Sequence, residues 1–254
     1  MVAIVAKLVN LRSDMILLAD FGNTRVKVAV KDGDSLNEIY CGPAMLGNLR
    51  DAVSGMVVDG GMWCAVRPLE NEIELWMRSM GLVPFRWDTP MPLQNGYSTP
   101  QTLGMDRLAA AVGAWSMNPG RNLLIIDAGT AITYDLVTSD GVYQGGNIAP
   151  GIEMRLKALH DYTGSLPLVQ AHGDTPWLGS DTATAIRSGV VTGVRNEIKG
   201  YIHDAGQRYE SVLVFLTGGD AEYFDLIDKS ANFVAHNLVI RGLSCIVDYN
   251  ENKI

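Results

Sequence analysis

A short pattern near the start of the chain is repeated in its second half. The apolar run MILLAD ends at Asp20 and is followed by Gly22, and the run LLIID ends at Asp127 and is followed by Gly129. In both places a second strand-like run leads into an Asp-Gly pair, at 32–33 and 140–141, which is typical of a hairpin turn. The repeat indicates an internal duplication, so we expect two similar halves.

Strand-like and helix-like segments alternate along the chain, which predicts an α/β fold. We divide the chain into an N-terminal extension (1–14), an N-terminal domain (15–118) and a C-terminal domain (119–254). The expected strands lie at 15–20, 25–34, 36–41, 61–66, 81–85, 122–127 and 211–217, and the expected helices at 44–57, 69–80, 105–115, 151–161 and 181–203, with another helix beginning after the Gly-Gly turn that follows residue 217.

The stretch 84–103 differs from its surroundings. It contains four prolines and shows little periodicity. A loop of this length inside a compact domain is more often functional than merely connecting. We therefore expect it to contribute to a site.

Composition narrows the range of functions. A net charge of −8 argues against a nucleic-acid partner, since no basic surface is implied. The three cysteines are far apart and have no metal-ligand spacing, which is typical of free thiols in a reducing cytoplasm. The apolar start of the chain is interrupted by Lys7, Arg12 and Asp14, and this favours neither a signal peptide nor a membrane span.

Three glycine-containing turns follow predicted strands, in DFGNT, DAGTA and TGGDA. Exposed backbone N–H groups in such turns can bind phosphate, although each could equally be an ordinary turn. Asp20 and Asp127 could hold Mg²⁺ or another cation, or could cap their own turns. Lys27 could neutralise phosphate or could be a solvated strand residue. The usual phosphate-binding motifs, such as GxxxxGK[ST] and GxGxxG, do not occur in the chain.

Asp106 and Arg107 begin a predicted helix directly after the proline-rich loop. Arginine can bind a substrate carboxylate through two hydrogen bonds. An aspartate beside it could accept the proton of a substrate hydroxyl that attacks phosphorus. The competing interpretation is a helix start, with the aspartate complementing the helix dipole and the arginine exposed on the surface.

In five segments the chain resembles the type III pantothenate kinases of the actin-like superfamily, which also holds acetate and sugar kinases. The segments occur in family order from Met15 onward: DFGNTRVK (20–27), NGYSTPQTLGMDR (95–107), DAGTAITYD (127–135), GGNIAPGIEMRLKAL (145–159) and DTATAIRSGVVTG (181–193). Phe21 stands where the family often has Ile or Val, Asp181 replaces a frequent Asn, and residues 1–14 have no counterpart.

The resemblance implies two ribonuclease-H-like domains with ATP in the cleft between them. It assigns ATP binding to Asp20, Phe21, Gly22, Asn23, Thr24, Arg25, Val26, Lys27 and Thr130. It assigns the pantothenate pocket to Tyr97, Gly104, Met105, Asp106, Arg107 and Thr182.

The resemblance also implies chemistry and assembly. Asp106 would be the general base, Asp20 would organise Mg²⁺ directly or through water, and Asp127 would hold K⁺ or NH₄⁺. Family members are homodimeric, and the expected location is the cytoplasm. Two alternatives stay open: a kinase of the same superfamily acting on another hydroxyl or carboxylate, and a catalytically silent regulator that keeps the fold.

Overall fold

The computed structural model describes residues 15–224, 233–235 and 237–251. Its first sheet has the strand order β3-β2-β1-β4-β5. The outer pairs β1–β2 and β2–β3 are antiparallel, whereas β4 and β5 lie parallel to β1. The strands are β1 (Met15–Phe21), β2 (Val26–Asp32), β3 (Ser35–Gly42), β4 (Gly61–Ala65) and β5 (Leu82–Pro84).

The second sheet repeats this pattern with one strand added. Its order is β11-β10-β7-β8-β9-β6. Strand β8 pairs antiparallel with both β7 and β9. On the other side of β7, β10 and β11 follow in parallel pairings. The duplication predicted from the sequence is therefore confirmed. The strands are β6 (Gln94–Asn95), β7 (Leu123–Ala128), β8 (Ala131–Val137), β9 (Val142–Pro150), β10 (Leu213–Thr217) and β11 (Phe233–Val234).

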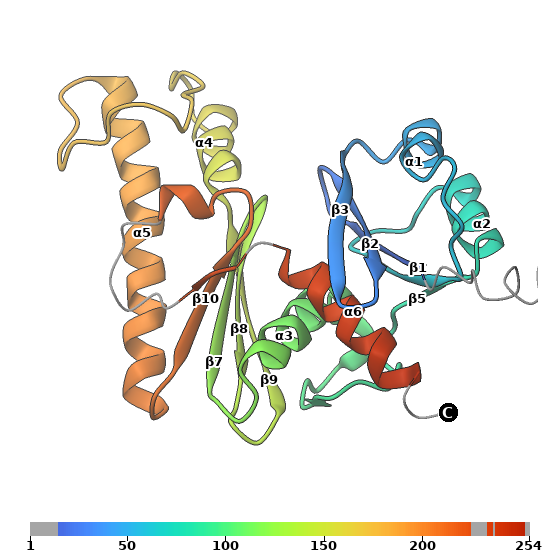
Figure 1. The fold of residues 1–254 in the computed structure, drawn as a ribbon. Coiled ribbons are helices and arrows are strands. Elements are labelled where there is room, and N and C mark those ends of the chain that lie inside the picture. Colours follow the sequence, from blue (N-terminus) through green and yellow to red (C-terminus); the bar gives the residue numbers. More distant parts are fainter. Residues whose placement is uncertain (1–14, 225–232, 236, 252–254) are drawn as a thin grey trace, which may run out of the picture.

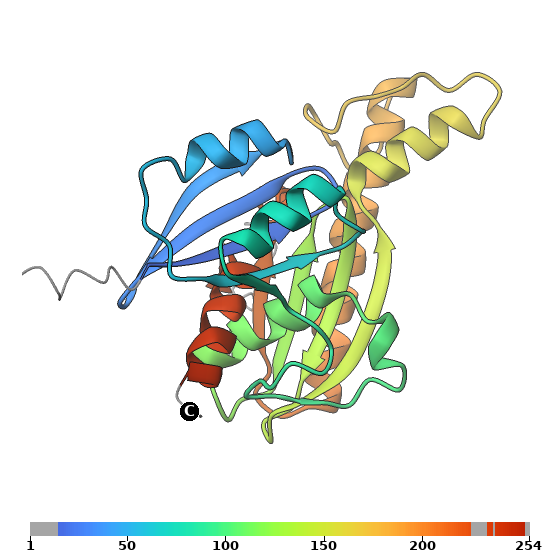
Figure 2. The same cartoon turned by 90° about the vertical axis from the view of Figure 1, so that its right-hand side faces the viewer.

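Figure 1 shows how the helices divide between the two sheets. Helices α1 (Leu46–Ala52) and α2 (Asn71–Ser79) cover the outer face of the first sheet. Helices α4 (Ile152–Asp161) and α5 (Thr182–Arg208) lie on the far side of the second. Helices α3 (Met105–Met117) and α6 (Leu238–Glu251) lie between the sheets, and Figure 2 shows them crossing below the first sheet.

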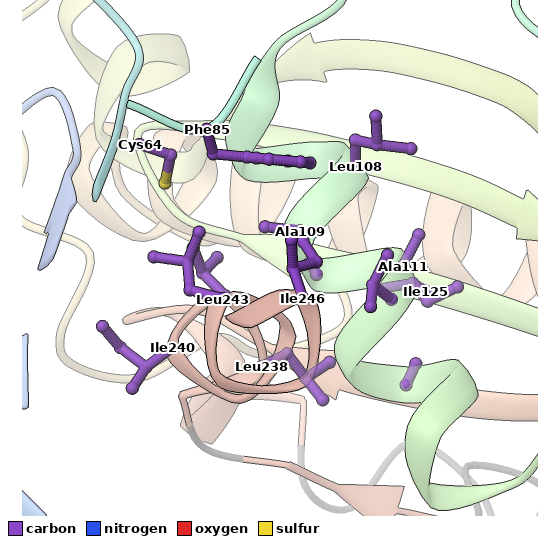
Figure 3. Packing of buried hydrophobic residues seen from close by; sticks show 14 of the residues in the cluster. Cys64, Phe85, Leu108, Ala109, Ala111, Ile125, Leu238, Ile240, Leu243 and Ile246 are labelled. Atoms are coloured by element: carbon purple, nitrogen blue, oxygen red, sulfur yellow. The ribbon is translucent and has the colours of Figure 1, made fainter. Parts of the chain in front are cut away.

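The central core joins both halves. Helix α3 contacts β4, β7 and β8, and α6 contacts β1, β2 and β4. One hydrophobic cluster therefore includes Leu18 and Met62 of the first sheet together with Ile125 and Phe215 of the second. Figure 3 shows its centre, where side chains of the two helices interdigitate.

Helices α3 and α6 approach each other closely because glycines lie at their contact. A Cβ on Gly113 would overlap the carbonyl oxygen of Leu238, and a Cβ on Gly242 would overlap that of Ala109. The run of buried alanines in α3 keeps the rest of this surface shallow. Small residues at a helix contact let the two backbones approach closely, so this pair forms a rigid support beneath the sheets.

The structure differs from the sequence-based expectations in five places. Helix α1 ends at Ala52 instead of 57, and α5 extends to Arg208 beyond 203. The expected helix after the Gly-Gly turn is a short 3₁₀ turn at Ala221–Tyr223 in the described part of the chain, and helix α6 was not predicted. The loop 84–103 contains β6 and a 3₁₀ turn at Pro100–Thr102.

The proline-rich segment and the last helix each pack against the sheet formed by the other half of the sequence. Strand β6 pairs with β9 of the second sheet, while α6 packs beneath the first. The division at 118–119 stays a prediction about folding units, and the expected extension 1–14 lies outside the described residues. Within the described residues, no helix is long and apolar enough to cross a membrane.

Candidate active site

The DFGNT stretch forms a tight turn at the end of β1. The backbone N–H of Gly22 donates to the carbonyl of Arg25 at 3.0 Å. Asn23, Thr24 and Arg25 are exposed in this turn, and Val26 is buried as the first residue of β2. Phe21 points into the core of the first half. The polar residues of the turn are therefore the ones available to a ligand.

The DAGTA stretch forms the corresponding turn after β7. The backbone N–H of Gly129 donates to the carbonyl of Ala131 at 3.1 Å. The N–H of Gly22 likewise donates to a carbonyl within its own turn, that of Arg25. The hydroxyl oxygens of Thr24 and Thr130 lie 3.3 Å apart. The two duplicated turns therefore face each other directly, one from each sheet.

Three aspartates form one electrostatic group behind these turns. Asp20 and Asp127 end β1 and β7, and Asp106 lies in the first turn of α3. Burial, followed by repulsion from Asp106 and Asp127, raises the pKa of Asp20 to about 7. Burial, followed by repulsion from Asp106, raises the pKa of Asp127 to about 6. Burial also raises the pKa of Asp106, against an opposing hydrogen bond from the backbone of Arg107.

A group of half-buried, mutually repelling carboxylates suits a cation-dependent site. Carboxylate oxygens are the preferred ligands of Mg²⁺, and a bound cation removes the repulsion that raises these pKa values. In the described part of the chain, no three His, Cys, Asp or Glu side chains lie close enough to hold one metal ion among themselves. A cation here would therefore complete its shell with water, backbone or phosphate oxygens.

Lys27 lies beside these carboxylates. It is paired with Asp20 across β1 and β2, and its charge lowers the pKa of both Asp20 and Asp127. Its ammonium donates to the side-chain oxygen of Asn237 at 3.1 Å, and the amide of Asn237 donates to Glu38 at 3.0 Å. Asn237 adopts a left-handed φ of 60° just before α6. No local pattern pointed to Asn237, because its partners Lys27 and Glu38 lie on distant strands.

Two further residues shape the surroundings of the aspartates: Cys64, to which the sequence assigned no role in the site, and Gly218 of the predicted TGGDA turn. The thiol of Cys64 on β4 contacts Asp20 Oδ1 at 3.6 Å, and burial raises the pKa of this thiol well above its usual range. Gly218, in the TGGDA turn after β10, has a φ of 98°. A Cβ there would overlap the Ala128 carbonyl and the Asp127 carboxylate, so only glycine leaves room for both.

Helix α3 positions the base candidate. Gly104 is the N-cap residue, and a Cβ on it would crowd the carboxylate of Asp106. Met105 begins the helix, and Tyr97 lies near β9, with its ring 6.4 Å from that of Tyr143. The side-chain oxygen of Asn95 accepts from the backbone of Tyr97 at 3.0 Å. The proline-rich loop therefore lies next to the start of α3.

Arg107 is not on the surface. It is 6% exposed, and Nε and Nη2 both donate to Asp135 on β8, with Nη2 to Oδ1 at 2.6 Å. The bidentate arginine–carboxylate contact expected from the sequence thus exists, but with a carboxylate of the chain itself. Sequence reasoning missed Asp135 although it ends the motif DAGTAITYD.

Thr182 is not brought to the other predicted substrate residues within one chain. It is exposed at the first turn of α5, next to Asp181, which caps that helix through a reciprocal pair of contacts with Thr184. Figures 1 and 2 both place this end of α5 away from α3. Phe21 and Val26 point into the core instead of the site. The predicted residues that do come together are Asp20, Thr24, Lys27, Asp106, Asp127 and Thr130.

Known proteins resemble the chain along most of its length. The family model for type III pantothenate kinase matches residues 16–204. A type III pantothenate kinase of Bacteroides fragilis is 47% identical over 244 residues, which cover 94% of this chain and 100% of that protein. One of Porphyromonas gingivalis is 41% identical over 240 residues, which cover 92% of this chain and 98% of that protein.

Solved structures share the fold at low sequence identity. A Campylobacter jejuni protein named as a Baf family transcriptional activator has a TM-score of 0.61 at 20% identity, covering 93% of this chain and 100% of its own. A Sinorhizobium meliloti protein named as a 2-dehydro-3-deoxygalactonokinase has a TM-score of 0.54 at 12% identity, covering 92% and 99%. These similarities concern the fold alone.

Proposed function

The chain belongs to the type III pantothenate kinase family, and from that premise we propose that it phosphorylates pantothenate with ATP, the first step of coenzyme A biosynthesis. The observation that carries the proposal is the convergence of two duplicated turns on three half-buried carboxylates. Phosphoryl transfer depends on positioning and charge neutralisation more than on covalent help from the protein. This geometry offers both.

The ATP phosphates would lie between the two turns. Gly22, Asn23 and Thr24 would contact them from the first half, and Thr130 from the second. The hydroxyls of Thr24 and Thr130 support this role because they already meet at 3.3 Å. Lys27 would add a positive charge, since its ammonium already acts on both Asp20 and Asp127.

We assign Mg²⁺ to Asp20 and a monovalent cation, K⁺ or NH₄⁺, to Asp127. When bound, these ions supply positive charge to the phosphate oxygens. The raised pKa values of both carboxylates support the assignment, because each carboxylate lacks sufficient compensating charge from the protein. The chain's part is to hold the two carboxylates on adjacent strand ends of the two sheets.

Asp106 would act as general base on the pantothenate hydroxyl. Burial raises its pKa, which brings it closer to the range in which a carboxylate can take a proton near neutral pH. Tyr97 from the proline-rich loop, with Gly104, Met105 and Arg107 at the start of α3, would line the pocket. The hydroxyl of pantothenate would face Asp106 and its carboxylate would face Arg107.

We also propose a homodimer. Thr182 begins α5, and that end of the helix lies away from α3, so a second copy would have to supply Thr182 to the substrate pocket. Large exposed apolar side chains gather around α4 and the start of α5, as expected for a protein interface. They are Ile148, Met154, Tyr162, Leu168, Trp177 and Leu178. The free thiols of Cys41, Cys64 and Cys245 fit a reducing compartment, for which we propose the cytoplasm.

A coupled ADP-release assay tests the function. The purified protein should release ADP when pantothenate, ATP, Mg²⁺ and K⁺ are present, and far less when K⁺ is replaced by Na⁺. Sugars and acetate serve as competing substrates for the alternative kinase activity. ADP release with one of these and none with pantothenate would overturn the substrate, and no release with any of them would favour a silent regulator.

A further inference from the structure

At the substrate end of α3, Arg107 belongs to a buried polar network whose other members, Asp135 and Tyr143, have no part in the function proposed above. Asp135 on β8 is 1% exposed and accepts hydrogen bonds from Arg107 Nε and Nη2. The hydroxyl of Tyr143 on β9 donates to the same oxygen, Asp135 Oδ1, at 2.6 Å. Tyr143 is fully buried. Three elements, α3, β8 and β9, are thus joined by charge-assisted hydrogen bonds.

The network fixes the direction of Arg107. A guanidinium has five N–H groups in a rigid fork, so two contacts to one carboxylate determine its plane. Nε and Nη2 face Asp135, which turns the rest of the fork, including Nη1, away from that carboxylate. Burial alone would lower the pKa of Arg107, but the hydrogen bonds and charge of Asp135 raise it, so the side chain stays charged.

The sheet makes space for this contact. Gly146, opposite Asp135 in the β8–β9 register, could not carry a side chain, because a Cβ would lie against both the backbone of Tyr134 and the carboxylate of Asp135. The ring of Tyr143 in turn lies 6.4 Å from that of Tyr97, in the proline-rich loop. The network therefore extends from the sheet interior to two parts of the proposed pantothenate pocket.

We propose that Asp135 and Tyr143 are positioning residues that hold Arg107 in the orientation in which it receives the substrate carboxylate. This rests on the proposed function. Tyr143 fixes the carboxylate of Asp135, Asp135 fixes the guanidinium plane, and the outward N–H groups of Arg107 meet the anionic end of pantothenate. The hydroxyl of pantothenate is then held against Asp106, the neighbouring residue on the same helical turn.

Tyr143→Phe is the informative variant, because it removes one hydroxyl and leaves the ion pair intact. The KM for pantothenate should rise at least about tenfold, the loss expected when a hydrogen bond to a charged group is removed and its partner shifts. The KM for ATP and the kcat should stay within about twofold. Asp135→Asn is unsuitable as the main test, since it would leave a buried charge unpaired.

Tyr134→Phe is the matched control. Tyr134 is also buried in the second sheet, but its hydroxyl donates to Glu197 on α5 and its ring stacks on Tyr201, away from α3. Like Tyr143→Phe, Tyr134→Phe removes one tyrosine hydroxyl from the second sheet. Its KM for pantothenate should be that of the wild type, so a rise shared by both variants would assign the effect to general loosening of the sheet and overturn the proposal.

A double-mutant cycle with Arg107→Lys separates positioning from a structural role. If Tyr143 acts through the guanidinium, Tyr143→Phe should change the KM for pantothenate by less than about twofold in the Lys background. Equal effects in both backgrounds, or an effect on kcat or on the KM for ATP alone, would refute the proposal. Wild-type turnover of pantothenate is measured first, so failure of the proposed function is distinguished from failure of this inference.

Asp135→Glu provides a second arm should Tyr143→Phe prove unstable in urea. It keeps the charge but moves the carboxylate by one methylene, so Arg107 stays paired in an altered orientation. The same selective rise in the KM for pantothenate is expected. A folded Asp135→Glu protein with wild-type KM values would show that the guanidinium orientation does not matter.

Discussion

Among single residues, Asp106 is the one whose substitution should reduce turnover most. We expect Asp106→Asn to lower kcat by roughly 10²–10⁴, the usual effect of losing an acid–base group, while ATP binding stays close to that of the wild type. The substitution keeps the shape of the side chain and removes its basicity. Steady-state ADP release and nucleotide titration measure the two quantities, and near-normal turnover would exclude Asp106 as the base.

The ionised carboxylate of Asp20 should lower the free energy of unfolding above neutral pH. Its pKa is raised to about 7 in the folded state, so the folded protein binds more protons than the unfolded chain between about pH 4 and pH 7. Stability from this group is therefore present at low pH and is lost as the pH rises through about 7.

Asp20→Asn should accordingly raise the Tm of the nucleotide-free and Mg²⁺-free protein. We expect a gain of at least a few °C at pH 8 and little change near pH 4. Thermal unfolding at the two pH values gives the comparison. A Tm at pH 8 equal to or below that of the wild type would show that the carboxylate is better compensated than its surroundings indicate.

At the scale of elements, the contact between α3 and α6 is decisive because it supports both sheets. Gly242→Ala would place a methyl group on the Ala109 carbonyl, and backbone cannot move aside as a flexible side chain can. We expect a loss of about 1–3 kcal/mol or more in the free energy of unfolding, as in other overpacked cores. Urea unfolding at unchanged m-value measures it.

Gly200→Ala in α5 is the matched control for that substitution. It is also a mid-helix glycine, but no atom lies within 4 Å of the added Cβ. Alanine is favoured over glycine in a helix by about 1 kcal/mol, so this variant should be equally or more stable than the wild type. Similar losses in both variants would mean that helix geometry, and not the α3–α6 contact, sets the effect.

Element boundaries were predicted well where the signal is local. The strands around Asp20 and Asp127 follow from short apolar runs that end in turn residues, and α3 follows from its apolar periodicity. Helix α6 was missed although a local signal was present, since its buried residues Val239, Leu243 and Ile246 recur with helical spacing. Strand β6 was missed because two residues pair only through a distant partner, β9.

For the whole molecule, the proposed homodimer ties assembly to activity. Trp177 is 88% exposed in the segment leading to α5. Trp177→Glu should bury a charge in the interface and convert the dimer to a monomer, which light scattering after size-exclusion chromatography would detect. Activity should fall with dimer content if a second copy supplies Thr182. A fully active monomer would remove Thr182 from the site.

The sequence by itself determined the duplicated α/β architecture, the two Asp-x-Gly turns and the acidic residue at the start of α3. These follow from periodicity and turn chemistry, which depend on neighbours along the chain. The contact between Thr24 and Thr130 depends on how the two sheets pack against each other. Their separation in sequence leaves no local trace of the contact.

Only the tertiary structure decided which partners the charged residues have. Arg107 could have faced solvent, substrate or another side chain, and folding placed it against Asp135. Lys27 could have been a solvated strand residue, and folding placed it beside two carboxylates and Asn237. A buried charge must find compensation wherever packing brings it. The partner of a buried charge therefore depends on how the core is assembled. The sequence predicted Arg107 as a surface or substrate-binding residue, and the structure places it inside the core against Asp135.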